Sequence, residues 1–120
     1  LLTSVMVKED YLASNADTVQ RFCNALAAAM KLIREDKSAY VSAMTAEFAN
    51  LDKTVVAAGS DRLLATRGFV PLSPVVSKAE WDAIVEHDTL AGTVRKAFSF
   101  EEMVDNRFAQ KAAEAFGLRG

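Results

Sequence analysis

The longest regular pattern of apolar residues runs from Asn15 or Ala16 to about Glu35. Three- and four-residue spacings place one set of side chains on a single stripe, as on the core-facing side of an amphipathic helix: Val19, Phe22, Cys23, Leu26, Met30 and Ile33. The opposite side carries a second, weaker apolar strip, formed by Ala25, Ala28 and Leu32. We therefore predict a long helix here, with cover on two sides.

Two shorter helices are predicted next. After a break at Asp36–Ser38, one helix is expected to end around Asn50 and to bury one face made of Tyr40, Val41, Met44 and Phe48. Asp52 is placed to cap the third helix, which has Gly59 as a weak point and carries Val55, Val56, Leu63 and Leu64. The connector at 67–74 contains two prolines and a glycine, so we expect an ordered loop there.

Two capping boxes predict the last helices. Ser77-Lys78-Ala79-Glu80 and Ser99-Phe100-Glu101-Glu102 both place a serine three residues before a glutamate. The fourth helix should bury Trp81, Ile84 and Val85 and stop near Gly92. The final helical region should stop at Gly117 and carries Met103, Val104, Phe108, Ala112 and Phe116 at helical spacing.

Only the beginning of the chain has strand character. The apolar run from Leu1 to Val7 ends at the charged Lys8–Asp10, and it predicts a strand around Thr3 to Val7 whose sheet partners lie elsewhere. The sequence starts without an initiator Met or a signal peptide, so we interpret Leu1 as a cut end. The predicted fold is mainly α, with one N-terminal strand followed by five or six helices, and residues 1–120 form a single unit.

Composition narrows the class of protein. The 120 residues suit one domain. Fourteen Lys and Arg against sixteen Asp and Glu, without a run of one sign, argue against nucleic acid as a partner. Hydrophobic residues make up 51% of the chain, yet no apolar stretch is long enough to span a membrane. The single cysteine excludes an internal disulfide.

The polar residues suggest no catalytic centre. His87 is the only histidine and lacks partners at metal-binding spacing, so we interpret it as complementing a helix dipole. Cys23 lies within the apolar stripe, where a thiol packs as a small hydrophobe. The acidic cluster of Glu101, Glu102 and Asp105 is explained by capping.

Three arginines, Arg62, Arg67 and Arg95, could each hold an anion, but their spacing defines no site. Trp81 and the phenylalanines are interpreted as core residues. No phosphate-binding loop, nucleophile elbow or dinucleotide fingerprint occurs. We therefore predict no enzyme activity, no cofactor, no metal and no catalytic residue, and the residues that contact a ligand stay unassigned.

Several phrases resemble solute-binding proteins of ABC transporters, in the branch for nitrate, sulfonates, taurine and thiamine precursors. The run Val5–Phe22 is similar to that family's strand followed by "(D/E)-(F/Y)-L-x-x-N-P-(D/E)-x-V-x-(R/K)-F", with Ala16 in place of the usual proline. Four later segments resemble the C-terminal end of that family's sequences: Ser77–Trp81, Leu90–Gly92, Phe100–Asp105 and Arg107–Ala109.

The resemblance implies that the chain is the C-terminal piece of a two-lobed α/β periplasmic-binding-protein fold. Its parent would capture a small organic or anionic solute and deliver it to an ABC permease, in a periplasmic or extracytoplasmic location. No binding residue carries over from the family.

Two alternatives stay open: an enzyme of thiamine-pyrimidine synthesis, whose catalytic histidine and cysteine arrangement has no match here, and a free-standing helical module for protein interaction or oligomerisation. As a fragment, the chain is expected to form a homo-oligomer.

Overall fold

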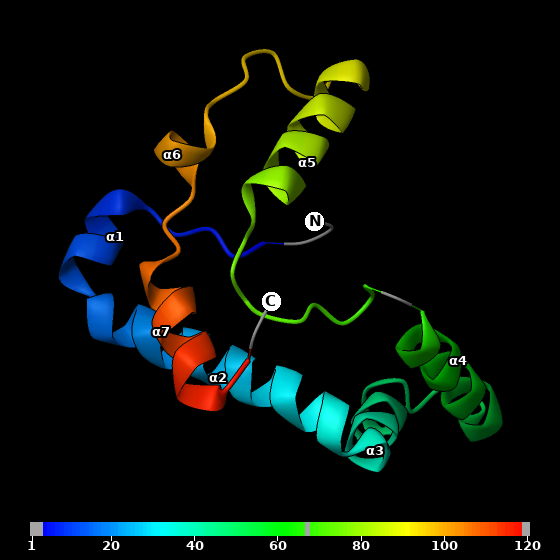
Figure 1. Ribbon diagram of the computed structural model, residues 1–120. Coiled ribbons are helices and arrows are strands. Elements are labelled where there is room, and N and C mark those ends of the chain that lie inside the picture. The colour runs from blue at the N-terminus through cyan, green and yellow to red at the C-terminus, as the bar shows by residue number, and fades with distance from the viewer. Residues whose placement is uncertain (1–3, 67, 119–120) are drawn as a thin grey trace.

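The computed structural model describes residues 4–66 and 68–118, and helices make up 68% of it. The prediction of a mostly helical chain is therefore confirmed. The helices, shown in Figure 1, are α1 Glu9–Ser14, α2 Ala16–Glu35, α3 Lys37–Glu47, α4 Lys53–Ala65, α5 Lys78–Leu90, α6 Phe100–Met103 and α7 Arg107–Phe116.

The core lies where α7 packs against α2. Ala27 of α2 and Ala112 of α7 are fully buried, and Ala113 and Leu118 complete the cluster. Cys23, Met30, Val75 and Phe116 pack around it. Alanine side chains add little volume between two helix backbones, so the helices can approach closely.

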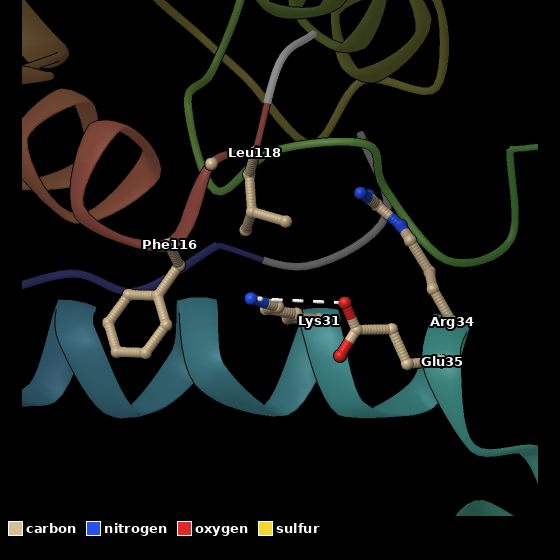
Figure 2. A pocket seen from close by; sticks show the side chains of 6 residues that line it. Lys31, Arg34, Glu35, Phe116 and Leu118 are labelled. Atoms are coloured by element: carbon tan, nitrogen blue, oxygen red, sulfur yellow. Dashed lines mark ion pairs between the residues drawn. The ribbon is translucent and has the colours of Figure 1, made fainter.

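The two core helices run in the same direction. Near their N-terminal ends, Gln20 Nε2 donates a hydrogen bond to the carbonyl oxygen of Phe108 at 3.1 Å. Near their C-terminal ends, Lys31 and Glu35 lie beside Phe116 (Figure 2). Helices 88 residues apart in sequence thus form one parallel pair.

Capping hydrogen bonds confirm most of the predicted helix ends. Ser77 and Ser99 each accept a hydrogen bond from the backbone of the glutamate three residues on, and both reciprocal contacts are present. Asp52 Oδ1 accepts from two backbone N–H groups at the start of α4. Gly117 has φ 66°, and Leu118 N donates to Ala113 O at 2.8 Å, which closes α7 in a Schellman motif.

Two side chains fix the connector between α4 and α5. The Asn106 side-chain amide pairs with the backbone of Val76, accepting from its N–H at 3.0 Å and donating to its carbonyl at 2.8 Å. Arg34 of α2 donates to the carbonyl of Pro71. The predicted ordered loop is therefore confirmed from residue 68 onward.

The remaining helices extend away from this core as two arms. Figure 1 shows the α3–α4 pair at one end of α2, and the α5–α6 pair on the far side of the connector. The Cα radius of gyration is 16.5 Å, whereas a compact domain of this length has about 14 Å. The accessible surface is 9045 Å², about 2,700 Å² more than a compact 13.0 kDa protein exposes.

The predicted N-terminal strand is wrong over the described part of its range. Residues 4–8 have no regular secondary structure, and Val5, Met6 and Val7 are exposed; Leu1, Leu2 and Thr3 lie outside the described residues. An extended segment becomes a strand only when a neighbour accepts its backbone hydrogen bonds, and no described segment does so. With no strand or sheet in the described ranges, the expected piece of an α/β fold is corrected to an all-helical arrangement.

Two further helix boundaries differ from the prediction. Glu9 and Asp10 do not simply end an apolar run: they form the first turn of α1, where carboxylates favour the positive end of the helix dipole. The last helical region is split, because Val104–Asn106 leave the helix. There Asn106 pairs with Val76, and Asp105 accepts hydrogen bonds from the backbone and guanidinium of Arg107.

The close contact of α2 with α7 predicts that Ala112 tolerates no enlargement. Ala112→Leu should lower the free energy of unfolding by about 1–3 kcal/mol, because extra methylenes must displace packed backbone. Urea unfolding followed by circular dichroism measures it. Ala115→Leu is the matched control, since Ala115 is exposed on the same helix. Equal stability of the two variants would contradict this packing.

The capping box of α5 predicts a specific pH dependence. The backbone N–H and the hydroxyl of Ser77 donate to Glu80 and hold the pKa of that carboxyl below its ordinary value. Its stabilising contribution should therefore be complete above the unfolded-state pKa of about 4.3 and be lost as pH falls through the lower folded-state pKa.

The test compares Glu80→Gln with the wild-type chain by urea unfolding across pH. The difference in unfolding free energy should be largest near neutral pH and shrink in acid. Glu86→Gln, in the middle of the same helix, serves as the control for loss of one charge. A difference between Glu80→Gln and wild type that stays constant in acid would contradict the role of the ionised carboxylate.

Candidate functional site

The residues weighed as catalytic candidates lie on separate elements. His87 is exposed in the last turn of α5, and its Nδ1 lies 3.0 Å from Asp88 Oδ1. Cys23 lies on α2, and α5 makes no contact with α2. A histidine–cysteine pair, which the enzyme alternative would require, is therefore not assembled from these two residues.

Cys23 is held as a core residue, as predicted. It packs against the alanine cluster, and burial raises the pKa of its thiol. A raised pKa lowers the fraction of thiolate, which is the reactive form. The environment therefore disfavours a nucleophilic role.

The acidic cluster serves local structure. Glu102 Oε2 accepts hydrogen bonds from the backbone N–H and hydroxyl of Ser99, which lower the pKa of Glu102. Asp105 accepts from Arg107, and this contact lowers the pKa of Asp105 and raises that of Arg107. Both carboxylates are held in the ionised form, so neither is prepared to act as a general acid.

Two of the three arginines considered as anion clamps, Arg62 and Arg95, lie on different elements. Arg62 lies in the last turn of α4, and Arg95 is exposed in the loop between α5 and α6; Arg67 lies outside the described residues. Trp81 is half-buried, and its Nε1 donates to the carbonyl of Phe98 at 3.3 Å. That bond ties α5 to the segment before α6, but α5 contains no buried residue, so the predicted burial of Trp81, Ile84 and Val85 is only partial.

Neither a metal site nor a membrane span is found in the described part of the chain. Over residues 4–66 and 68–118, no three His, Cys, Asp or Glu side chains gather closely enough to hold an ion. Over the same residues, no helix combines the length and apolar character needed to cross a bilayer.

One hollow lies between the C-terminal ends of α2 and α7 (Figure 2). It has a volume of about 290 Å³ and is lined by Lys31, Arg34, Glu35, Phe116, Gly117 and Leu118. Lys31 Nζ lies 3.8 Å from Glu35 Oε1, and Arg34 is used to hold Pro71. Lys31 and Arg34 lie near the C-terminal ends of two helices, where their positive charges offset the negative ends of the helix dipoles. These contacts explain the charges without a ligand.

A second, more apolar hollow of about 500 Å³ lies along α3 and the turn into α4. Val41, Thr45, Ala46, Ala49 and Leu51 line it, and Lys53 is its one charged residue. Like the first, it is a wide depression, so neither hollow would withdraw most of a small solute from water, as ligand sites do.

Sequence analysis misplaced one large apolar residue, which lies on the outer side of α2. Phe22 was assigned to the core-facing stripe, but it is 50% exposed. It shares a free face with Ala25, Ala29 and Leu32, all exposed, and Leu32 is 52% exposed. The spacing of three, four and three residues was a readable signal, because such a repeat keeps side chains along one seam of a helix. We call these four residues the outer stripe.

Comparison with known proteins gives one similarity. Over 110 residues, the chain is 24% identical to the "Putative binding protein YtlA" of Bacillus subtilis (strain 168). The alignment covers 91% of this chain and 33% of that protein, so the chain spans about a third of its relative's length. No protein-family model matches the chain, and no solved structure matches it. The chain is thus similar to a protein named for binding.

The burial of Cys23 predicts slow alkylation. At neutral pH, iodoacetamide should modify Cys23 several times more slowly in the folded chain than in the same chain unfolded in urea, because burial both shields the thiol and raises its pKa. Mass spectrometry of timed samples gives the two rates. A folded-state rate equal to or above the unfolded one would show an activated thiol and would favour the enzyme alternative.

Proposed function

We propose that this chain is part of the solute-binding component of an ABC importer, which captures a small organic or anionic solute and delivers it to a permease. The observation that carries the proposal is the similarity to a binding protein over nearly the whole chain. The phrases of Val5–Phe22 and of the last third of the chain, which resemble the nitrate, sulfonate, taurine and thiamine-precursor branch, support the same class.

The shape of the chain supports a role as one part of a larger assembly. Its helical arms leave about 2,700 Å² more surface exposed than a compact protein of this mass. The two hollows described above are open and shallow. The proposal therefore places the solute-contacting residues in the two thirds of the relative that this chain does not match.

The proposal includes no catalysis and places the protein outside the cytoplasmic membrane, in the periplasmic or extracytoplasmic space. No step in it needs a nucleophile or a cofactor. Cys23 is packed against the core, and His87 lies on α5 beside Asp88, so the proposal gives neither residue a catalytic role.

A second candidate function, a free-standing helical module for protein interaction or oligomerisation, is favoured by one specific observation. The outer stripe of α2 exposes Phe22 and Leu32 on one face, and single helices rarely leave such a face in water without a partner.

Binding measurements on two forms of the protein test the proposed function. Calorimetric titration with nitrate, taurine, an alkanesulfonate and a pyrimidine precursor of thiamine should show saturable binding of one of them to the polypeptide as its gene encodes it. The isolated 120-residue chain should bind none, because its hollows cannot enclose a solute.

Two outcomes would contradict the proposal. A gene-encoded polypeptide that binds no member of the panel would remove the solute class. Tight binding to the 120-residue chain alone would show that a complete site exists within it, contrary to the placement of the site in other parts of the protein.

A further inference from the structure

The outer stripe of α2 faces away from the core of the chain. α7 covers the side of α2 that carries Gln20 and the buried Ala27, and the residues of the outer stripe are exposed. From Phe22 to Leu32 the stripe spans ten residue steps, or about 15 Å of helix. In Figure 1, the side of α2 opposite α7 carries no other helix along its middle. The stripe is therefore a free apolar surface on a rigid, well-packed helix.

The order of residues along the stripe is self-complementary. Phe22 and Leu32 are the large members at its two ends, and Ala25 and Ala29 lie between them. If a second α2 is laid antiparallel along the first, Phe22 meets Leu32 of the second copy at each end. The alanines then meet at the two-fold axis, where their small side chains allow close approach.

Charges on one flank of the stripe fit the same arrangement. Arg21 and Glu35 lie two heptads apart on that flank, with Ala28 midway between them. Antiparallel pairing brings Arg21 of each copy next to Glu35 of the other, which gives two symmetric ion pairs. Parallel pairing would instead bring residues of the same sign to the same level of the helix. The antiparallel dipoles of the two helices also attract.

Both charged side chains are free to make this contact. Glu35 is 64% exposed, and within residues 4–66 and 68–118 its ion pair is the long contact to Lys31 at 3.8 Å. Arg21 is exposed and donates a hydrogen bond to Thr18 Oγ1 at 3.3 Å, within its own helix. Neither contact has to be broken inside a packed core for a partner to approach.

The surface of the chain leaves ample room for such an interface. A standard protein interface buries about 800 Å² on each partner, well below the roughly 2,700 Å² by which this chain exceeds a compact protein. We propose that the outer stripe is a homodimerisation surface, on which α2 of a second copy packs antiparallel. This inference is independent of the proposed transport function.

Sedimentation velocity on the 120-residue chain, from micromolar to millimolar concentration, tests the proposal. A reversible monomer–dimer equilibrium is expected. Ala25→Glu and Ala29→Glu should each abolish the dimer, because a carboxylate would be buried against an alanine of the second copy close to the two-fold axis. Ala83→Glu, an exposed alanine on α5, is the matched control and should dimerise as the wild type does. Far-UV circular dichroism of each variant confirms that it is folded.

A charge exchange tests the antiparallel orientation. Arg21→Glu and Glu35→Arg should each raise the dimer dissociation constant about tenfold, because two attractive pairs become repulsive. The double variant Arg21→Glu/Glu35→Arg should recover wild-type affinity, since the pairs are restored with reversed sign. A variant that merely failed to fold would not be rescued in this way, and high salt should reduce all of these differences.

Three outcomes would overturn the proposal. The first is a wild-type chain that stays monomeric throughout the concentration range. The second is a dimer that is insensitive to the glutamate substitutions in the outer stripe, which would place the interface elsewhere. The third is a longer polypeptide containing this sequence that is monomeric and protects Phe22 from solvent, which would make another part of the same chain the occupant.

Discussion

The close contact between α2 and α7 is the constraint on which the rest of the structure depends. It joins residues 88 positions apart, as the bond from Gln20 to the carbonyl of Phe108 shows, and so it closes most of the chain into one loop. Loop closure costs entropy that rises only slowly with length, so a contact of this span can be stable if its packing is dense. Ala27 and Ala112 provide that density, because neither leaves any surface exposed.

Elements farther from this contact are held by hydrogen bonds more than by buried area. Neither α3 nor α5 contains a buried residue, and each begins at a side-chain cap, Asp36 for α3 and Ser77 for α5. Caps specify where a helix starts but contribute only about 1 kcal/mol each. The Asn106 pairing with Val76 has a larger role, because it anchors the connector on which α5 depends to the first turn of α7. A few polar contacts to the core therefore set the positions of the two arms.

The sequence predicted the helices well, because their signals are local. The capping boxes at Ser77 and Ser99, the cap at Asp52 and the stop at Gly117 need only neighbouring residues, and all four are present. The strand failed because pairing is non-local: valines around Met6 favour extension, but no described segment offers a ladder. The split before α7 was missed for the same reason, since Asn106 leaves the helix for a partner 30 residues away.

The same distinction governs what could be inferred about a site. Negative inferences on Cys23 and Glu102 could be made from their neighbours, and the structure places both in packing or capping roles. The assignment of Phe22 to the core could not be secured, because two overlapping periodicities run along α2 and only tertiary packing decides which one is buried. The arrival of α7 decides it, because α7 covers the face of α2 that carries Cys23, Ala27 and Met30.

Phe22 and Leu32 are therefore left exposed on the other side of α2. Phe22 and Leu32 each bury more apolar area when covered than an alanine does. Covering the outer stripe would therefore gain more transfer free energy than covering alanines alone. The contact within the chain is centred on Ala27 and Ala112, and the side of α2 that carries Phe22 and Leu32 stays available for a contact with another surface. Phe22 and Leu32 are among the large hydrophobic side chains that the small core leaves exposed, and they form the part of that exposed surface that lies along α2.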